Sequence, residues 1–301
     1  MGQQPPSGDR PRNAFVLSGG GNLGSIQAGM LKALLASGIT PDLLVGTSIG
    51  SVNAAFLAAD PSPGQVEKLC ELWTTARSRD VFTWKPWRIA HALLRQGSLF
   101  PAERWRRYLT RWLPYENIED AAVPLSIMVT DFNDGTPVTL ESGSVIDALM
   151  ASTCLPGIFP PQRIGDGLYL DGVLAEQVPL KPAVDVGAET LYVLASGHAS
   201  PPPDARSPGQ ILRHALTILL FPRVRLDALQ LGDRHPELRI VQIPTVGAQV
   251  ALWDMSRHQE LIEEAYRETM EFLAGRRPDG SEDAETTTIP EITVEVEGQL
   301  A

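Results

Sequence analysis

The sequence predicts an α/β fold, a three-layer α/β/α sandwich around a mostly parallel central sheet. The main observation lies near the amino terminus, where two short apolar runs, residues 13–18 and 42–45, each lead through a turn into a helical pattern. This repeated order of strand, turn and helix is typical of a parallel α/β sheet. Later apolar runs repeat the order more loosely, so we expect the same fold to continue along the chain.

The first strand is predicted over residues 13–18, and a run rich in glycine follows it at residues 19–24. A helix is predicted over residues 25–37, because its methionine and leucine side chains recur on one side, and Gly38 supplies a left-handed stop. The second strand, residues 42–45, leads through a turn into a helix of small residues.

More strands and helices are predicted downstream. The strands cover residues 124–130, 190–195 and 238–243, and the helices cover residues 144–153 and 255–274. We expect Asp254 to cap the start of the last helix and Gly275 to end it. The sequence Gly165-Asp166-Gly167 is typical of a hairpin turn.

These elements predict one domain over residues 12–275, between a flexible amino terminus, residues 1–11, and an acidic tail, residues 276–301. From residue 278 onward the tail holds seven of the 36 acidic residues and no lysine or arginine. We expect this tail to be disordered. The alternative is an edge strand, because apolar residues alternate with polar ones near the end of the chain.

The charge balance and the cysteine content exclude several classes of protein. The formal net charge of −11 leaves no overall basic surface for nucleic acid. Cys70 and Cys154 are too few for a disulfide framework or a cysteine-rich zinc site, so we expect two buried thiols in a reducing compartment and no metal. We expect no secretory signal and no membrane-spanning helix. The prediction is a cytoplasmic protein, either free or peripheral at a membrane.

The turn after the second strand carries the motif G-x-S-x-G, as Gly46-Thr47-Ser48-Ile49-Gly50. A serine on a sharp turn between a strand and a helix has an exposed hydroxyl, and the flanking glycines relieve the crowding of the turn. The helix that follows directs its first N–H groups toward the same point. We predict that Ser48 is a nucleophile; the alternative is a serine that only caps the helix.

The run Gly19-Gly20-Gly21 is the candidate for an oxyanion site. Consecutive glycines allow backbone N–H groups to converge on an anion without obstruction by side chains. The same run, as Gly19-x-Gly21-x-x-Gly24, also fits the dinucleotide-binding fingerprint. That fingerprint expects an acid at the end of the second strand, whereas Asp42 stands at its start. Nucleotide binding is therefore the minor alternative.

A nucleophilic serine needs a base, and the sequence offers histidines and aspartates. Asp171 is the stronger candidate, because it follows the predicted hairpin in Leu170-Asp171-Gly172. Turn chemistry accounts for Asp166, and a turn cap accounts equally well for Asp131. None of the five histidines stands in a recognisable motif, and we expect each to be a surface or capping residue: His91, His198, His214, His235 and His258.

Taken in order, these motifs resemble the patatin-like phospholipase family. G-G-G-x-x-G follows the first strand, G-x-S-x-G follows the second, and Asp-Gly comes far downstream, after a stretch at residues 151–161 (ASTCLPGIFPP) that resembles the family's block before its catalytic aspartate. The resemblance implies a catalytic domain that hydrolyses lipid acyl esters without a metal. It also implies a Ser–Asp dyad of Ser48 and Asp171 and an oxyanion hole at Gly19, Gly20 and Gly21, with motif support from Gly24, Gly46, Gly50 and Gly172.

The chain departs from the family pattern at a few positions. Many members carry a cation where this chain has Leu23, Val173 replaces the second glycine of Asp-Gly-Gly, and Gln177 stands where asparagine is frequent. We expect these departures to affect rate and substrate more than the dyad. An aspartate is a poor base unless burial raises its pKa. A dyad without an imidazole favours esters and thioesters over amides.

Residues 84–113 have an unusual composition. They hold four of the six tryptophans and seven cations against one acid, Glu103. Tryptophan with lysine and arginine is typical of contacts at a membrane interface. One interpretation is a helical cap whose tryptophans pack on the sheet, and the other is a lid that contacts lipid; the two are compatible.

Together these observations predict a serine-dependent hydrolase of lipid acyl esters, of the phospholipase A or lysophospholipase type, that forms an acyl-enzyme on Ser48 with Asp171 as base. We expect no cofactor, a lipid or acyl-ester substrate and no nucleic acid partner, and the sequence leaves the oligomeric state open. The alternative is a catalytically weak protein on the same fold that binds lipid or acyl groups as a regulator.

Overall fold

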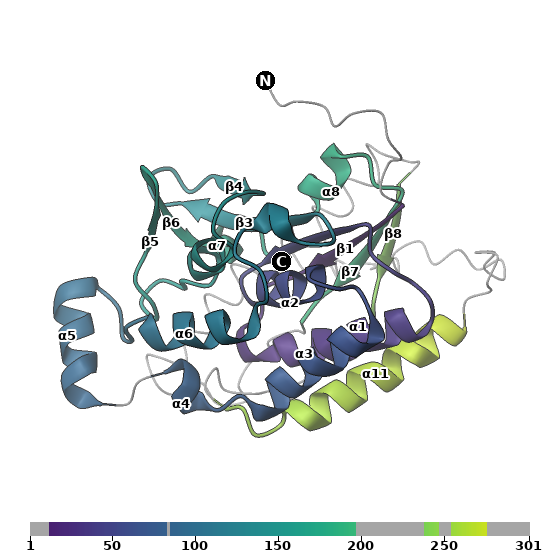
Figure 1. Ribbon diagram of the computed structural model, residues 1–301, viewed down its shortest axis with the longest axis horizontal. Coiled ribbons are helices and arrows are strands. Elements are labelled where there is room, and N and C mark those ends of the chain that lie inside the picture. The colour runs from purple at the N-terminus through teal and green to yellow at the C-terminus, as the bar shows by residue number, and fades with distance from the viewer. Residues whose placement is uncertain (1–11, 83–84, 197–237, 247–253, 276–301) are drawn as a thin grey trace, which may run out of the picture.

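The structure is a computed structural model that describes residues 12–82, 85–196, 238–246 and 254–275. Its centre is an eight-stranded sheet in which neighbouring strands follow the order β5-β6-β3-β2-β1-β7-β8, with β4 also paired to β3 (Figure 1). The strands are β1 (Asn13–Leu17), β2 (Leu43–Thr47), β3 (Leu125–Asp131), β4 (Pro137–Leu140), β5 (Gln162–Ile164), β6 (Gly167–Asp171), β7 (Thr190–Leu194) and β8 (Arg239–Gln242).

The part of the sheet from β3 through β2, β1 and β7 to β8 is parallel. The strands β4, β5 and β6 add antiparallel pairings at the β3 end. Side chains of β1 alternate between two buried faces: Phe15 and Leu17 join the larger apolar core, whereas Ala14 and Val16 join a smaller core on the opposite face. A parallel sheet buried on both faces is what repeated strand–helix units produce.

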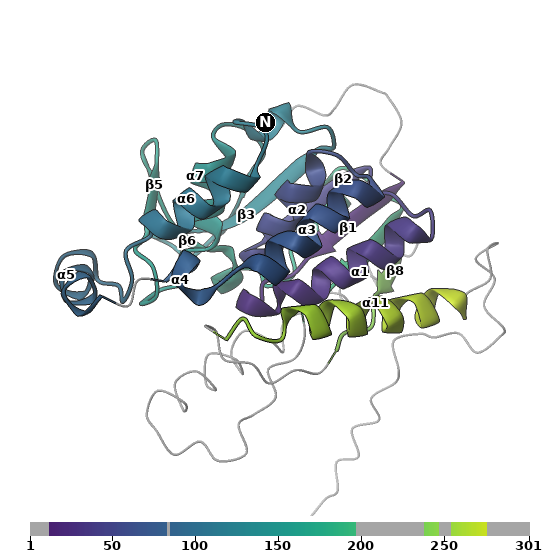
Figure 2. The ribbon, with the colours of Figure 1, turned by 60° about the horizontal axis from the view of Figure 1, so that its bottom comes forward.

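Helices cover both faces of the sheet. The larger core is closed by α1 (Gly24–Ala36), α2 (Ile49–Ala58), α3 (Pro63–Thr75) and α11 (His258–Ala274), which lie together in Figure 2. The smaller core is closed by the segment that contains α8 (Lys181–Asp185). These layers confirm the predicted α/β/α sandwich with a mostly parallel sheet.

The helix α11 lies along α1, although the two are far apart in the sequence (Figures 1 and 2). Gly29 of α1 makes the close approach possible, because a Cβ added there would lie 2.3 Å from the carbonyl oxygen of Ile262. The helix α11 is therefore held against α1 by backbone contact as well as by apolar side chains.

The predicted elements are present, with ends shifted by a few residues. Gly38 has a φ of 75° at the end of α1, and Gly165 has a φ of 57° in the turn between β5 and β6, as the left-handed stop and the hairpin turn require. The prediction that Asp254 caps the last helix is wrong. Arg257 holds the N-cap position, and the carboxylate of Asp254 instead accepts hydrogen bonds from the backbone N–H and the hydroxyl of Ser256.

The segment predicted as a helical cap contains α5 (Pro86–Gln96) and α6 (Glu103–Trp112), which follow the short α4 (Ser78–Val81). The helix α6 packs against α7 (Val145–Ser152), and α5 stands away from the rest of the protein in both ribbon views (Figures 1 and 2). Within the described ranges, we find no helix with the length and apolar character needed to cross a bilayer. The predictions for residues 1–11 and 276–301 lie outside the described residues.

Candidate active site

Ser48 lies at a strained turn between β2 and α2. Its φ is 51° and its ψ is −127°, and no other non-glycine residue in the described part of the chain has a positive φ. Such a conformation persists only where the surroundings fix it. Here the flanking glycines allow backbone segments to touch: a Cβ on Gly46 would lie 2.5 Å from the Cα of Ser51, and one on Gly50 would lie 2.4 Å from the carbonyl oxygen of Leu17.

The strand β3 brings Ser48 and Asp171 together. Because β4 occupies one edge of β3, β2 and β6 follow one another along its other edge. Thr47, at the end of β2, pairs with Met128, and Asp171, at the end of β6, pairs with the next residue, Val129. The two strands therefore end at the same point, and residues that are 123 positions apart in the sequence become neighbours.

The hydroxyl of Ser48 donates a hydrogen bond of 2.8 Å to Oδ2 of Asp171, while Oδ1 accepts one of 3.0 Å from the backbone N–H of Val173. Ser48 is 8% exposed and Asp171 is 2% exposed. Burial raises the pKa of Asp171 to about 7, although the hydrogen bonds from Val173 and Ser48 act in the opposite direction. The serine makes no side-chain hydrogen bond to the helix, so the capping interpretation does not describe it. A carboxylate with such a pKa can accept a proton from a bonded hydroxyl.

The glycine run adjoins this pair, but its backbone N–H groups are not equivalent. A Cβ on Gly19 would lie 3.3 Å from the Cβ of Ser48, which puts the run beside the hydroxyl. The N–H of Gly19 donates to the carbonyl oxygen of Gln177 at 3.1 Å and is therefore engaged. Among the hydrogen bonds of the described residues, none uses the N–H of Gly20 or Gly21. These two residues remain the candidate donors to an anion.

The other glycines of the motifs allow close packing around the site. A Cβ on Gly172 would lie 2.3 Å from the carbonyl oxygen of Met128, and one on Gly24 would lie 2.7 Å from the ring of Trp73. The dinucleotide interpretation loses its acid, because Oδ2 of Asp42 accepts the N–H of Asn13 at the beginning of β1. That carboxylate lies at the opposite end of the strand from the glycine run.

Several residues that hold the dyad in place are not evident from sequence motifs. Oγ of Ser152 accepts the backbone N–H of Ser48 at 2.9 Å and donates to the carbonyl oxygen of Met128 at 2.7 Å. Oγ1 of Thr130 donates to the backbone carbonyl of Asp171 at 2.8 Å. Each hydroxyl thus fixes the backbone of one member of the pair. For Ser152, the run of small polar residues at 152–154 was the available signal, and its role depends on contacts far along the chain.

A second group of buried polar residues holds the glycine run. Oγ of Ser196 donates to the carbonyl oxygen of Gly19 at 2.6 Å, and the N–H of Ser196 donates to Oγ of Ser18 at 2.9 Å. The side-chain amide of Gln27 donates to the carbonyl oxygens of Ser18 and Leu194, both at 2.9 Å. These bonds tie the ends of β1 and β7 to α1, so the run has little freedom to move.

The structure brings no histidine to the dyad within the residues that it describes. His91 is exposed on α5. His258 differs from our expectation of a surface or capping residue: it is buried, its Nδ1 lies 2.8 Å from the carbonyl oxygen of Trp73, and burial lowers its pKa. Asp131 accepts the N–H of Asn133, as a turn cap does. The remaining histidines lie outside the described residues: His198, His214 and His235.

The three departures from the family pattern have different surroundings. Leu23 is part of the larger apolar core. The side chain of Val173 lies against Gly19, since a Cβ on that glycine would be 3.2 Å from Cγ2 of the valine. Gln177 supplies the carbonyl that accepts the N–H of Gly19, and its own buried side-chain oxygen has no hydrogen-bond partner among the described residues. Val173 and Gln177 therefore shape the site directly, whereas Leu23 contributes to packing.

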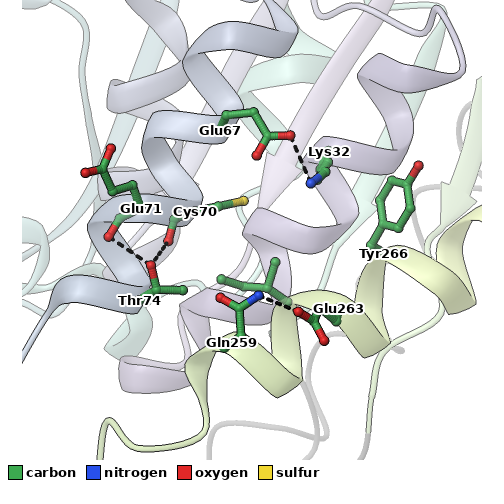
Figure 3. A pocket seen from close by; sticks show the side chains of 9 residues that line it. Lys32, Glu67, Cys70, Glu71, Thr74, Gln259, Glu263 and Tyr266 are labelled. Atoms are coloured by element: carbon green, nitrogen blue, oxygen red, sulfur yellow. Dashed lines mark hydrogen bonds and ion pairs between the residues drawn. The ribbon is translucent and has the colours of Figure 1, made fainter.

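An open depression of about 310 Å³ lies elsewhere, between α1, α3 and α11 (Figure 3). Its lining includes the ion pair of Lys32 and Glu67, whose Nζ and Oε1 are 2.9 Å apart, and the thiol of Cys70. Burial raises the pKa of this thiol to about 11, which keeps it protonated. Neither Ser48 nor Asp171 lines the depression, so the site is defined by its hydrogen bonds and not by this hollow.

Cys70 and Cys154 are both buried and unpaired, as the sequence predicted. In the described ranges, no group of three or more histidine, cysteine, aspartate or glutamate side chains is arranged to hold a metal ion. The chemistry that the described site offers is that of a hydroxyl, a carboxyl and backbone N–H groups.

The chain is similar in fold to two solved structures. These are VipD from Legionella pneumophila (TM-score 0.46, 15% identity, 89% of this chain and 67% of that chain) and human GIVD cytosolic phospholipase A2 (TM-score 0.47, 13% identity, 88% of this chain and 58% of that chain).

Two relatives are more similar to the chain in sequence than these structures are. Patatin-like phospholipase domain-containing protein 6 of Homo sapiens is 30% identical over 186 residues, which are 61% of this chain and 13% of that protein. An uncharacterized NTE family protein of Mycobacterium tuberculosis is 25% identical over 197 residues, 65% of this chain and 52% of that protein. The chain thus spans a small part of the mammalian relative and about half of the mycobacterial one. The family model of the patatin-like phospholipases matches residues 15–184, which include Ser48, Asp171 and the glycine run, and the chain therefore belongs to the patatin-like phospholipase family.

Proposed function

We propose that the protein is a serine hydrolase of lipid acyl esters, of the phospholipase A or lysophospholipase type, with a catalytic domain over residues 12–275. The observation that carries the proposal is the 2.8 Å hydrogen bond from Oγ of Ser48 to Oδ2 of Asp171, at a turn whose strained φ of 51° presents the hydroxyl. Membership of the patatin-like phospholipase family supports a lipid as the substrate.

In the proposed reaction, Oγ of Ser48 attacks the acyl carbonyl carbon while its proton passes to Asp171. The N–H groups of Gly20 and Gly21 stabilise the negative charge that develops on the carbonyl oxygen. The tetrahedral intermediate then expels the alcohol, which takes the proton from Asp171, and the acyl group remains on Ser48. Water attacks this acyl-enzyme and gives a proton to Asp171; the bond from Oγ to the acyl carbon then breaks, Oγ of Ser48 takes the proton back from Asp171, and the fatty acid leaves.

The pKa of about 7 for Asp171 suits both halves of this cycle. Near neutral pH the carboxylate and the carboxylic acid are both populated, so one group can accept a proton and return it. The hydrogen bond from Val173 to Oδ1 leaves Oδ2 to face the serine. Alcohols and thiols leave more readily than amines without a strong acid, so esters and thioesters are the expected substrates.

We also propose that the protein is cytoplasmic and meets membrane lipid through part of residues 84–113. The two buried, unpaired thiols support a reducing compartment. The tryptophans and cations of that segment support contact with lipid.

The second candidate function is a catalytically weak protein that binds lipid or acyl groups as a regulator. The small exposure of Ser48, 8%, favours it, because a substrate needs access to the hydroxyl. In this alternative the same fold is kept, but the serine does not react.

A fluorophosphonate probe separates the two candidates, because it labels only an activated serine. We expect labelling of the parent, none of Ser48→Ala, and unchanged labelling of the matched control Ser256→Ala, which replaces a serine outside the site. Hydrolysis of a soluble ester by Asp171→Asn should fall by about 10²–10⁴, the usual contribution of a positioned base. A parent that is folded but neither labelled nor active on esters would reject the hydrolase and favour the regulator.

A further inference from the structure

The helix α5 carries an unusual apolar face. Of the large apolar side chains in the described residues, only Trp87, Leu94, Leu99 and Phe132 are exposed, and the two most exposed, Trp87 at 64% and Leu94 at 83%, are on α5. Trp87, His91 and Leu94 follow the i, i+4, i+7 spacing of one helix face. The helix protrudes from the body in both ribbon views (Figures 1 and 2). We call this stripe of Trp87, Ala90, His91 and Leu94 the outer face of α5.

Cations flank the outer face of α5, and acids are absent from its neighbourhood in the sequence. Arg88 and Arg95 follow Trp87 and Leu94 by one residue and so lie beside the stripe on the helix surface. The guanidinium of Arg88 lies 5.1 Å from the centre of the Trp87 ring, and Nζ of Lys85 lies 6.0 Å from it. Residues 85–102 contain no aspartate or glutamate, although the whole chain has a net charge of −11. The positive charge of α5 is therefore local.

The neighbouring helix α6 also combines tryptophan with arginine, but two of these side chains, Trp105 and Arg106, contact the body of the protein. Trp105 is 7% exposed, and its Nε1 donates to Oγ1 of Thr153 at 2.8 Å. Arg106 forms an ion pair of 2.6 Å with Asp147 of α7. The contrast divides residues 84–113 into a helix that packs on the body and a helix whose outer face has no described partner.

We infer that the outer face of α5 docks on an anionic lipid bilayer, with the helix in the plane of the headgroups. An apolar stripe flanked by cations is the form of a helix that binds at this depth, and the tryptophan ring suits the interface. Charge complementarity selects the anionic surface over a neutral one. The inference rests on the proposed function, since it names the surface from which the lipid would be taken.

Contacts between α5 and the body make this docking relevant to the site. Ile89, on the other side of the helix, packs against the larger core. After the helix, the N–H groups of Leu99 and Phe100 donate to the carbonyl oxygens of Gly157 and Ile158. These two carbonyls belong to residues 151–161, the segment whose Ser152 holds the backbone of the candidate nucleophile. Docking would therefore place a bilayer beside the segment that supports the dyad.

The experiment measures binding to vesicles of phosphatidylcholine alone and of phosphatidylcholine with phosphatidylglycerol, in the Ser48→Ala background so that no lipid is consumed. The Ser48→Ala protein, the parent in these vesicle measurements, should prefer the anionic vesicles, and added salt should weaken its binding. Replacing Arg88 and Arg95 with glutamine should weaken it by about 25-fold, since each cation near an anionic surface contributes a factor of roughly five. The matched control Arg107→Gln, Arg111→Gln in α6 removes the same charge and should have little effect.

A second variant tests the apolar contribution. The double variant Trp87→Ser, Leu94→Ser should lose most of the vesicle binding, while the same two changes with Ser48 intact should leave hydrolysis of a soluble ester unchanged. That hydrolysis also reports that the variant is folded.

Three vesicle results would each overturn the inference. They are equal binding by parent and variant, equal binding of the parent to neutral and anionic vesicles, and equal losses in the α5 and α6 charge variants. Light scattering that finds a dimer of the parent and a monomer of the Trp87→Ser, Leu94→Ser variant would also overturn it, because the outer face of α5 would then bind a second copy of the chain. Failure of ester hydrolysis by the parent would instead reject the proposed function and leave vesicle binding as measured.

Discussion

Replacing Asp171 with asparagine should stabilise the protein while it removes activity, and the gain should depend on pH. The carboxyl is 2% exposed, and its pKa is raised from 3.8 to about 7 because burial penalises the charged form. Asparagine has the same shape. Its oxygen can accept the N–H of Val173, and its NH₂ group can donate to Ser48, so both hydrogen bonds of the site can be kept.

The size of the effect follows from linkage between protonation and folding. A group whose pKa is higher in the folded state contributes stability that is present below the unfolded pKa and is lost as the pH rises through the folded pKa. With pKa values of 3.8 and about 7, ionisation of Asp171 costs about 2 kcal/mol at pH 5 and about 4 kcal/mol at pH 8. Asparagine has no such proton to lose. The advantage of the variant should therefore grow by about 2–3 kcal/mol between these pH values.

Urea denaturation of both proteins at pH 5 and pH 8 measures this difference in the free energy of unfolding. Ser48→Ala is the control, because it keeps the carboxyl and removes a hydrogen bond that lowers its pKa; its stability should fall with pH at least as steeply as that of the parent. If the difference between Asp171→Asn and the parent is the same at both pH values, the burial argument is refuted.

The remaining predictions concern the rate and the support of the site. Gly20→Ala should lower kcat by about 10²–10³, because the new Cβ would lie 2.6 Å from the Cβ of Ser196 and displace the run; adding Ser196→Gly should restore part of the rate, and no restoration would contradict the steric cause. Ser152→Ala should destabilise the protein by about 1–3 kcal/mol in thermal denaturation, because the N–H of Ser48 loses its acceptor; an unchanged Tm would count against that role. The kcat/KM for a soluble ester should rise with pH through about 7 as Asp171 ionises, and a flat profile across this range would argue against Asp171 as the base.

The turn that carries Ser48 could be predicted from the sequence because its causes are local. A buried strand, two glycines and a helix of small residues occupy consecutive positions, and each restricts the turn in the same way. Asp171 depended on a hairpin pattern and on resemblance to a family. Its position opposite Ser48 comes from pairing with β3, which no local pattern encodes.

The parts that the sequence did not predict depend on contacts between distant segments. The carbonyl of Gln177 accepts the N–H of Gly19 from far along the chain, and the N–H of Ser48 donates to Oγ of Ser152, 104 positions away. The same holds for the difference between α5 and α6. Both helices combine tryptophan with arginine, and contacts with α7, from Trp105 to Thr153 and from Arg106 to Asp147, separate the packed helix from the exposed one.

The shared edge of β3 has a consequence for how enzymes of this design can diversify. Asp171 meets Ser48 because, along β3, the residues paired with β6 follow directly after those paired with β2. A slip of β6 by one residue relative to β3 would turn the aspartate to the opposite face of the sheet. That register is the pairing of Asp171 with Val129 and of Leu170 with Thr130, whereas the turn at Gly165 joins β6 only to β5. The loop of residues 155–161, whose carbonyl groups accept hydrogen bonds from the segment after α5, lies between Ser152 and β6 and takes no part in this pairing. Insertions and substitutions there can therefore reshape the entrance for a new lipid while the distance between nucleophile and base stays the same.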